Sequence, residues 1–172
     1  PALLTLTPTS VQAKCFGTAT GTVNVVGSGG TPSYSYNING GAYQASNSFA
    51  NQFAATYAVG IKDANGCVAS QTVTVSQPSA LAISVSSQNA NCTASNGVGS
   101  ATVTGGTPIY TYTWTGNGGA LPVSHGLPSG TYTVTATDMN GCVISGQAVI
   151  GVTPGGTAVI SASSAATCNG SN

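Results

Sequence analysis

The chain contains the same series of motifs twice. Gly-Gly-Thr-Pro at residues 29–32 recurs at 105–108, and Asp63-Ala-Asn-Gly-Cys67 recurs as Asp138-Met-Asn-Gly-Cys142. The copies lie about 76 residues apart, which is the size of a small domain and exceeds the ~20–50 residues of solenoid repeats and propeller blades. A tandem array of such units more often presents a surface or spans a distance than it catalyses a reaction.

Prolines mark the boundaries of the repeats. Pro1-Ala-Leu-Leu-Thr-Leu6 resembles Pro78-Ser-Ala-Leu-Ala-Ile83 and Pro154-Gly-Gly-Thr-Ala-Val159. We therefore expect a first repeat over residues 1–77, a second over 78–153 and the truncated start of a third over 154–172. The chain is then expected to be part of a longer array.

Charged side chains are almost absent. Two basic and two acidic side chains give a net charge of zero, and nucleic-acid affinity depends on Lys and Arg neutralising phosphates. We therefore predict no nucleic-acid partner. No apolar run approaches the ~18 residues that would cross a bilayer, so no membrane insertion is expected. Near-zero charge favours association between chains.

Each complete repeat has two cysteines at matched positions. Even pairing at matched spacing predicts one disulfide per repeat, namely Cys15–Cys67 and Cys92–Cys142, which close loops of about 50 residues. Cys168 would then have its partner beyond the end of the chain. A zinc site is not expected, because there is no C-x₂-C pair and only His125 could assist.

Alternation of apolar with small or polar residues predicts half-buried antiparallel strands. It occurs at 22–26, 33–38, 57–61 and 72–75, and again at 101–103, 110–114, 132–136 and 143–152. Gly-Gly and Asn-Gly pairs mark the turns between them, and no segment has helical spacing. About seven short strands in ~76 residues predict an all-β fold of tandem, small immunoglobulin-like or fibronectin-like antiparallel β-sandwiches, each with one disulfide.

Aromatic residues lie on one face of the predicted strands. Trp114 aligns with Ile38 and shares a face with Tyr110 and Tyr112, which favours a place in the sandwich core. The alternative is an exposed aromatic platform that binds carbohydrate. The residues assigned to the core are Tyr34, Tyr36, Tyr57, Tyr110, Tyr112, Trp114 and Tyr132.

The Asp-x-Asn-Gly segments are interpreted as tight turns. A calcium loop needs several hard oxygen ligands, whereas a lone Asp beside Asn-Gly is explained by side-chain capping of a turn. With one acid per repeat there is no carboxylate pair for glycoside hydrolysis. We predict no catalytic residue, metal or cofactor; the assigned turn residues are Asp63, Asn65, Gly66, Asp138, Asn140 and Gly141.

Together these motifs resemble the SprB repeat. The likeness runs from Cys15-Phe-Gly17 through Gly-Gly-Thr-Pro at 29–32 to the Asp63–Cys67 segment, and it recurs from 105 to 142. This module is strung in long arrays along giant surface adhesins of gliding Bacteroidota. The resemblance implies an extracellular β-sandwich module, exported by the type IX secretion route, in a protein that adheres to surfaces or takes part in gliding motility.

The sequence therefore predicts a structural or adhesive repeat of a long extracellular adhesin or fibre, with no enzymatic activity. Its expected partners are neighbouring repeats of the same protein, and surface polysaccharide or like chains in a fibre. One alternative is a subunit of a self-assembling extracellular filament. A weaker alternative is a carbohydrate-binding module.

Overall fold

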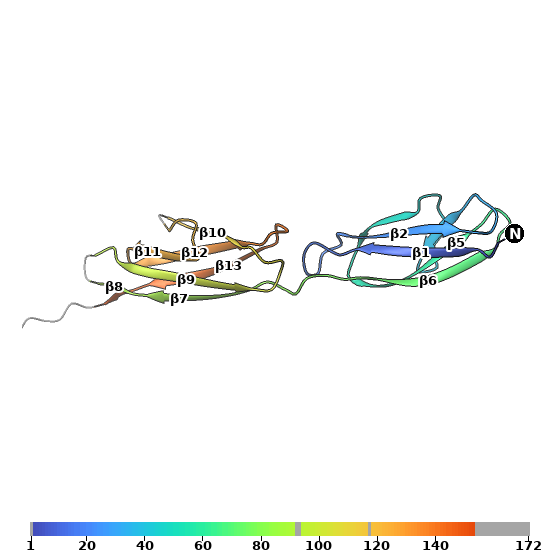
Figure 1. The fold of residues 1–172 in the computed structure, drawn as a ribbon. Coiled ribbons are helices and arrows are strands. Elements are labelled where there is room, and N and C mark those ends of the chain that lie inside the picture. The colour runs from blue at the N-terminus through green and yellow to red at the C-terminus, as the bar shows by residue number, and fades with distance from the viewer. Residues whose placement is uncertain (1, 92–93, 117, 154–172) are drawn as a thin grey trace, which may run out of the picture.

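The computed structural model describes residues 2–91, 94–116 and 118–153 (Figure 1). Every regular element in these ranges is a β-strand, which confirms the all-β prediction. Within them, no helix is long and apolar enough to cross a membrane. The expected start of a third repeat, residues 154–172, lies outside the described residues, as do Cys92 and Cys168.

Two three-stranded antiparallel sheets make up the first module. One has the strand order β1-β2-β4 and the other β3-β5-β6. The strands are β1 (Thr5–Val11), β2 (Gly21–Ser28), β3 (Ser35–Ile38), β4 (Ser48–Gln52), β5 (Ala55–Lys62) and β6 (Val68–Val75). Val23 and Val25 of β2 are fully buried against Val59 and Ile61 of β5. Their alternation along each strand directs these side chains into the space between the two sheets.

The second module repeats this topology strand for strand, with the orders β7-β9-β11 and β10-β12-β13. Six strands form the two layers of each module, in place of the seven or so expected. The strands are β7 (Ala82–Gln88), β9 (Gly97–Thr104), β10 (Thr111–Trp114), β11 (Val123–Leu127), β12 (Gly130–Thr137) and β13 (Val143–Ile150). A short parallel pair, β8 (Ala90–Asn91) with β14 (Val152–Thr153), adds to the second module.

Trp114 lies at the centre of the second core. It packs with Ala101, Val134 and Ala148, and 6% of its surface is exposed. Its indole Nε1 donates a hydrogen bond to the carbonyl of Leu121 at 2.9 Å. A Cβ at Gly99 would lie 2.9 Å from Trp114 Cη2, which is closer than real side chains approach. The large ring is therefore accommodated by a glycine on the facing sheet.

The seven aromatic residues assigned to the core divide by depth. Three are buried, and the other four are half-buried. The buried residues are Tyr36, Tyr57 and Trp114, and the half-buried ones are Tyr34, Tyr110, Tyr112 and Tyr132.

Four tyrosine hydroxyls are bound to backbone carbonyls. Tyr34 and Tyr110 donate to the first glycine of the Gly-Gly turn of their own module, at 2.6 and 2.7 Å. Tyr57 and Tyr132 donate to the carbonyl four residues earlier, at 2.9 and 3.0 Å. The rings thus lie toward the core while their hydroxyls fix neighbouring turns.

The two modules are arranged end to end, with their strands running along the long axis (Figure 1). The chain crosses from the first to the second between β6 and β7. The loop at residues 12–20 and the turn at 138–142 both lie at the junction, whereas the N-terminus lies at the opposite end of the first module.

Candidate functional site

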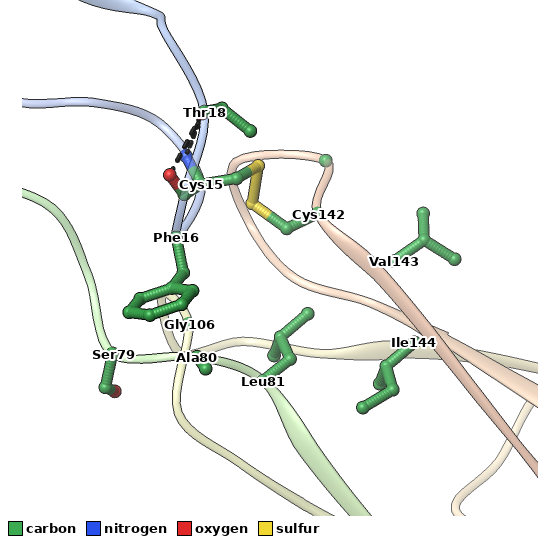
Figure 2. A pocket seen from close by; sticks show the side chains of 11 residues that line it. Cys15, Phe16, Thr18, Ser79, Ala80, Leu81, Gly106, Cys142, Val143 and Ile144 are labelled. Atoms are coloured by element: carbon green, nitrogen blue, oxygen red, sulfur yellow. Dashed lines mark hydrogen bonds between the residues drawn. A yellow bond between two sulfur atoms is a disulfide. The ribbon is translucent and has the colours of Figure 1, made fainter. Parts of the chain in front are cut away.

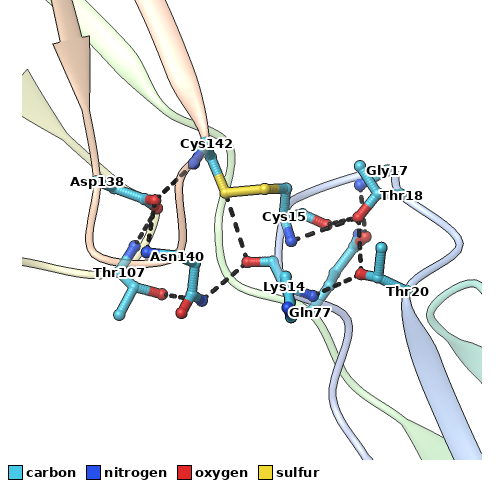
Figure 3. Close-up of a disulfide and its surroundings, with 10 residues drawn as sticks. All are labelled: Lys14, Cys15, Gly17, Thr18, Thr20, Gln77, Thr107, Asp138, Asn140 and Cys142. Atoms are coloured by element: carbon cyan, nitrogen blue, oxygen red, sulfur yellow. Dashed lines mark hydrogen bonds between the residues drawn. A yellow bond between two sulfur atoms is a disulfide. The ribbon is translucent and has the colours of Figure 1, made fainter.

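A disulfide joins the two modules at their junction. Cys15 of the first module is bonded to Cys142 of the second, with a Cα–Cα distance of 5.8 Å (Figure 3), which is ordinary for a disulfide. Cys67 is free and exposed. The predicted pairs Cys15–Cys67 and Cys92–Cys142 are therefore wrong, and the bridge lies between repeats rather than within one.

The path of the chain explains why pairing within a module fails. Cys15 lies in the loop between β1 and β2, whereas Cys67 lies in the turn between β5 and β6. These connections are at opposite ends of the sandwich, because β1 runs toward the junction and β5 runs away from it. Eight-residue strands such as β5 rise about 26 Å along their length, which is far beyond the reach of a disulfide.

The turn that holds Cys142 is organised by the carboxylate of Asp138. Its Oδ1 accepts hydrogen bonds from the backbone N–H groups of Asn140 and Cys142 at 2.9 and 2.8 Å. Its Oδ2 accepts from the N–H of Thr107, in the Gly-Gly-Thr-Pro turn, at 2.8 Å. One buried carboxylate thus ties the two repeated motifs together, and this explains why they occur as a pair.

The same arrangement is present at the far end of the first module. Asp63 accepts from the N–H groups of Asn65 and Cys67 through Oδ1, and from that of Thr31 through Oδ2, at 2.8–3.0 Å. Gly30 has a φ of +60°, and a Cβ there would lie 2.7 Å from Asp63 Oδ2. Glycine is required at this position by both the left-handed backbone and the close approach of the carboxylate.

Both carboxyl groups are held ionised by these hydrogen bonds. The N–H of Thr31, followed by those of Cys67 and Asn65, lowers the pKa of Asp63 below its ordinary value of 3.8. At Asp138, burial alone would raise the pKa, but the N–H groups of Thr107, Cys142 and Asn140 outweigh it, and the pKa is again below 3.8. Hydrogen bonds to the charged form of a carboxylate favour that form.

Polar contacts accompany the disulfide. Asn140 Nδ2 donates to Thr107 Oγ1 at 2.8 Å within its own module and to the carbonyl of Lys14 at 2.9 Å across the junction. Gly17 donates its N–H to Oε1 of Gln77, in the linker, at 2.7 Å. The distance of 3.5 Å from Cys142 Sγ to the same Lys14 carbonyl is a van der Waals contact, because a disulfide sulfur carries no hydrogen.

A pocket of about 450 Å³ lies between the modules (Figure 2). The first module contributes Cys15, Phe16 and Thr18. The second contributes residues from the start of its chain and from its cysteine turn: Ser79, Ala80, Leu81, Gly106, Gly141, Cys142, Val143 and Ile144. The ring of Phe16 lies beside Ala80 and Gly106, so an apolar side chain of one module faces the end of the next.

The structure brings together only part of the residues named from the sequence. Asp138, Asn140 and Gly141 lie at the junction, whereas Asp63, Asn65 and Gly66 form the equivalent turn at the other end of the first module. Lys14 and Phe16 were not identified as contact residues. The strand order could have revealed them. Successive turns lie at alternate ends of the sandwich, and this places the loop after the first strand at the same end as the linker to the next module.

Other chemistry finds little support in the described part of the chain. No group of three or more His, Cys, Asp and Glu side chains lies together there. His125 is exposed on β11, and Lys62 Nζ lies 4.5 Å from the centre of the Tyr43 ring, where it makes a cation–π contact. Trp114 is buried, so it offers no open face on which a sugar could stack.

Comparisons with known proteins agree with this architecture. The family model described as the SprB repeat matches residues 7–43 and 84–119, once in each module. No curated protein sequence matches the chain.

Among solved structures, the three N-terminal domains of the Highly Immunogenic Outer Capsid protein (Hoc) of bacteriophage RB49 are similar. The TM-score is 0.52 at 15% identity, over 87% of this chain and 59% of that one. A C-terminal fragment of intimin, solved in complex with the intimin-binding domain of its translocated receptor, has a TM-score of 0.46 at 10% identity, over 87% of this chain and 64% of the fragment. The chain spans less than two thirds of either structure. The likeness to Hoc shows the fold, an immunoglobulin-like β-sandwich.

Proposed function

The chain carries two SprB-type repeats, and we propose from this that it forms part of the stalk of a long cell-surface adhesin or fibre. Its role would be to extend the stalk, to hold successive modules together and to present an adhesive region at a distance from the cell. The repeat family supports a surface protein. Secretion by the type IX route and a role in gliding motility are the finer parts of the proposal.

The disulfide between Cys15 and Cys142 is the observation that carries this function. A single peptide linker lets two domains swivel about it. A second covalent connection leaves only a hinge about the line that joins the two connections. The hydrogen bond from Asn140 to the carbonyl of Lys14 adds a directional contact beside the bridge. The junction therefore resists twisting, and bending is restricted to that one hinge direction.

The linker itself is short and stiffened by proline. Pro78 fixes its own φ and biases Gln77 toward extended geometry, and Gln77 Oε1 is held by the N–H of Gly17. With strands along the long axis, an eight-residue strand rises about 26 Å, and the turns at both ends bring the length of each module to roughly 35–40 Å. Length would thus grow with the number of repeats.

The surface fits a mainly structural role. Two basic and two acidic side chains in 172 residues leave a surface of hydroxyl and amide groups, and two of those charges, Asp63 and Asp138, are buried in turns. We propose neighbouring repeats as the principal partners, with surface polysaccharide or like chains as lateral partners. We propose no enzymatic activity.

Small-angle scattering tests the stalk proposal. The oxidised chain is compared with a Cys15→Ser/Cys142→Ser variant, and a Cys67→Ser variant serves as the control because Cys67 is outside the bridge. We expect the oxidised chain and the control to share one narrow distribution of long distances, and the double variant to show a broader one. A compact oxidised chain, with modules folded back on each other, would overturn the proposal.

A self-assembling filament is the second candidate. The observation that favours it is the exposed Cys67 beside a turn equivalent to the one at the junction, together with a net charge of zero. Sedimentation under oxidising conditions separates the two functions. A stalk segment stays a monomer over a wide concentration range, whereas a filament subunit forms progressively longer species.

A further inference from the structure

The far end of the first module has the same turn hydrogen bonds as the end of the second module that meets its neighbour. Gly30 donates its N–H to the carbonyl of Ala2 at 2.8 Å, as Gly106 does to that of Ser79 at 2.9 Å. Asn65 Nδ2 donates to Thr31 Oγ1 at 2.9 Å, as Asn140 does to Thr107 at 2.8 Å. The two ends therefore match bond for bond.

A pocket of about 270 Å³ lies at this end. Six of its lining residues correspond in position to residues that the second module contributes to the junction pocket. Ala2, Leu3, Leu4, Gly30, Cys67 and Val68 stand where Ser79, Ala80, Leu81, Gly106, Cys142 and Val143 stand at the junction. Leu3 is larger than its counterpart Ala80, and Asp63 and Asn65 also line the far pocket. The junction pocket in turn includes Ile144 and a segment of the other module.

That segment shows what a pocket of this kind holds. Cys15 is bonded to Cys142, the carbonyl of Lys14 accepts from Asn140, and Phe16 lies over the pocket wall (Figures 2 and 3). The second module binds this segment through Cys142 and Asn140, and both residues have counterparts at the far end of the first module. Cys67 is a free thiol, and Asn65 Nδ2 has a second N–H, because the side-chain amide carries two.

Apolar surface is also exposed at this end. Leu3 is 83% exposed and lines the pocket. Val68 lines it too, but its exposure of 65% is close to the 62% of its counterpart Val143 at the junction, so Leu3 carries this observation. Neighbouring exposed apolar side chains around a hollow are characteristic of a docking surface. At the junction, Phe16 lines the pocket together with Ala80 and Val143, the counterparts of Leu3 and Val68.

We propose that the pocket at Cys67 is an acceptor site for the cysteine-bearing loop of another repeat, equivalent to residues 14–18, placed ahead of this module. Cys67 would bond the cysteine of that loop, Asn65 would donate to the carbonyl before that cysteine, and an apolar side chain after it would cover Leu3. The inference rests on the array in the proposed function. It makes the bridge between modules a repeating feature, with one disulfide at each junction.

The bond formation is an oxidation of two thiols. The Cys67 thiol and the thiol of the incoming loop lose two protons and two electrons to a disulfide oxidant, which is reduced to two thiols. The chemistry proceeds by exchange, in which one thiolate attacks a mixed disulfide and displaces a thiolate. Docking of the loop would hold the two sulfurs together and favour this bond over exchange with small thiols.

A peptide of residues 12–20 tests the site directly. Its cysteine is supplied as a mixed disulfide with a coloured thiol, so attack by Cys67 releases one equivalent of that thiol. The full chain is used with Cys92→Ser and Cys168→Ser, which leaves Cys67 as the thiol outside the bridge. The control is a reordered peptide, which has the same residues in another order and its cysteine at the same position.

The ordered peptide should react roughly tenfold faster than the reordered one, since docking raises the effective concentration of its disulfide. Asn65→Ala should reduce this advantage about fivefold, the effect of one lost hydrogen bond. Asn140→Ala, which changes the junction turn, should leave the rate at Cys67 unchanged. Equal rates for the two peptides, or an advantage that survives Asn65→Ala, would overturn the acceptor site.

The result is separate from the test of the stalk. Equal peptide rates with an extended oxidised chain would remove the acceptor site and leave the stalk proposal standing. A compact oxidised chain whose Cys67 still reacts faster with the ordered peptide would overturn the stalk proposal and leave the acceptor site standing.

Discussion

Asn140 of the second module donates its side-chain N–H to the backbone carbonyl of Lys14 in the first, 126 residues away in sequence. The same amide donates to Thr107 within its own module. Asn140 therefore belongs both to the turn that organises its module and to the surface by which two modules meet. In the second copy of the Asp-x-Asn-Gly-Cys motif, Asp138 shapes the turn, while Asn140 and Cys142 bind the neighbouring module.

Trp114→Ala should lower the stability of the second module by about 3–5 kcal/mol, because it empties the centre of a small core. Leu121→Ala is the matched control, since its side chain is exposed while its carbonyl still accepts from Trp114; it should stay within about 0.5 kcal/mol. Denaturant unfolding followed by circular dichroism measures both. A loss under about 1 kcal/mol for Trp114→Ala would contradict the buried position.

Acid should destabilise both modules through their single carboxylates. The pKa values of Asp63 and Asp138 are below 3.8 in the folded chain, so each contributes stability that is present above the unfolded value and is lost as the pH falls through the folded value. The free energy of unfolding should therefore decline below about pH 4.

The control for this acid sensitivity is an Asp63→Asn/Asp138→Asn variant, which has no acidic side chain left. It should be less stable at neutral pH, and its stability should change little between about pH 2 and 5, apart from the terminal carboxyl group. Equal acid sensitivity of the two proteins would show that the turn carboxylates are not the titrating groups.

Cys15→Ser should lower the stability of both modules. The bridge joins residues 127 apart in sequence. While one module stays folded, the bridge closes a loop of about 60 residues in the other, which contributes about 4 kcal/mol in the chain-entropy model. A bridge within the first module would instead leave the second module unaffected. Calorimetry under non-reducing conditions separates these cases, with Cys67→Ser as the control, and a drop confined to the first module would favour a bridge within it.

The sequence predicted strands where side-chain alternation is strong, as in β2, β5, β9 and β12. It did not identify β1 and β4, or their counterparts β7 and β11. Pro8 lies within β1, which forms the edge of its sheet, and edge strands tolerate proline. In β4, Phe49 is the one large apolar side chain. Edge strands bury few side chains, so their pattern is weak, and their place is set by pairing with β2.

The turns were also recognised from Asp63, Asn65 and Gly66 and their counterparts, because side-chain capping and a left-handed glycine are local effects. The disulfide pairing was not recognised, because the partner of each cysteine depends on which end of the sandwich its turn occupies. Equal spacing of cysteines is produced by pairing within a repeat and by pairing between successive repeats alike. Only the three-dimensional path of β1 and β5 separates the two arrangements.

Peptide mapping without reduction tests the bridge between modules most directly. After free thiols are blocked, cleavage following lysine and preceding aspartate leaves Cys15 in residues 15–62, Cys67 and Cys92 in 63–137, and Cys142 and Cys168 in 138–172. With Cys168→Ser in the chain, Cys142 is the one cysteine of the last fragment, and we predict a disulfide-linked pair of 15–62 with 138–172 and blocked Cys67 in 63–137. A linked pair of 15–62 with 63–137 would contradict the account, because it would place Cys15 in a bridge with Cys67 or Cys92 instead of Cys142.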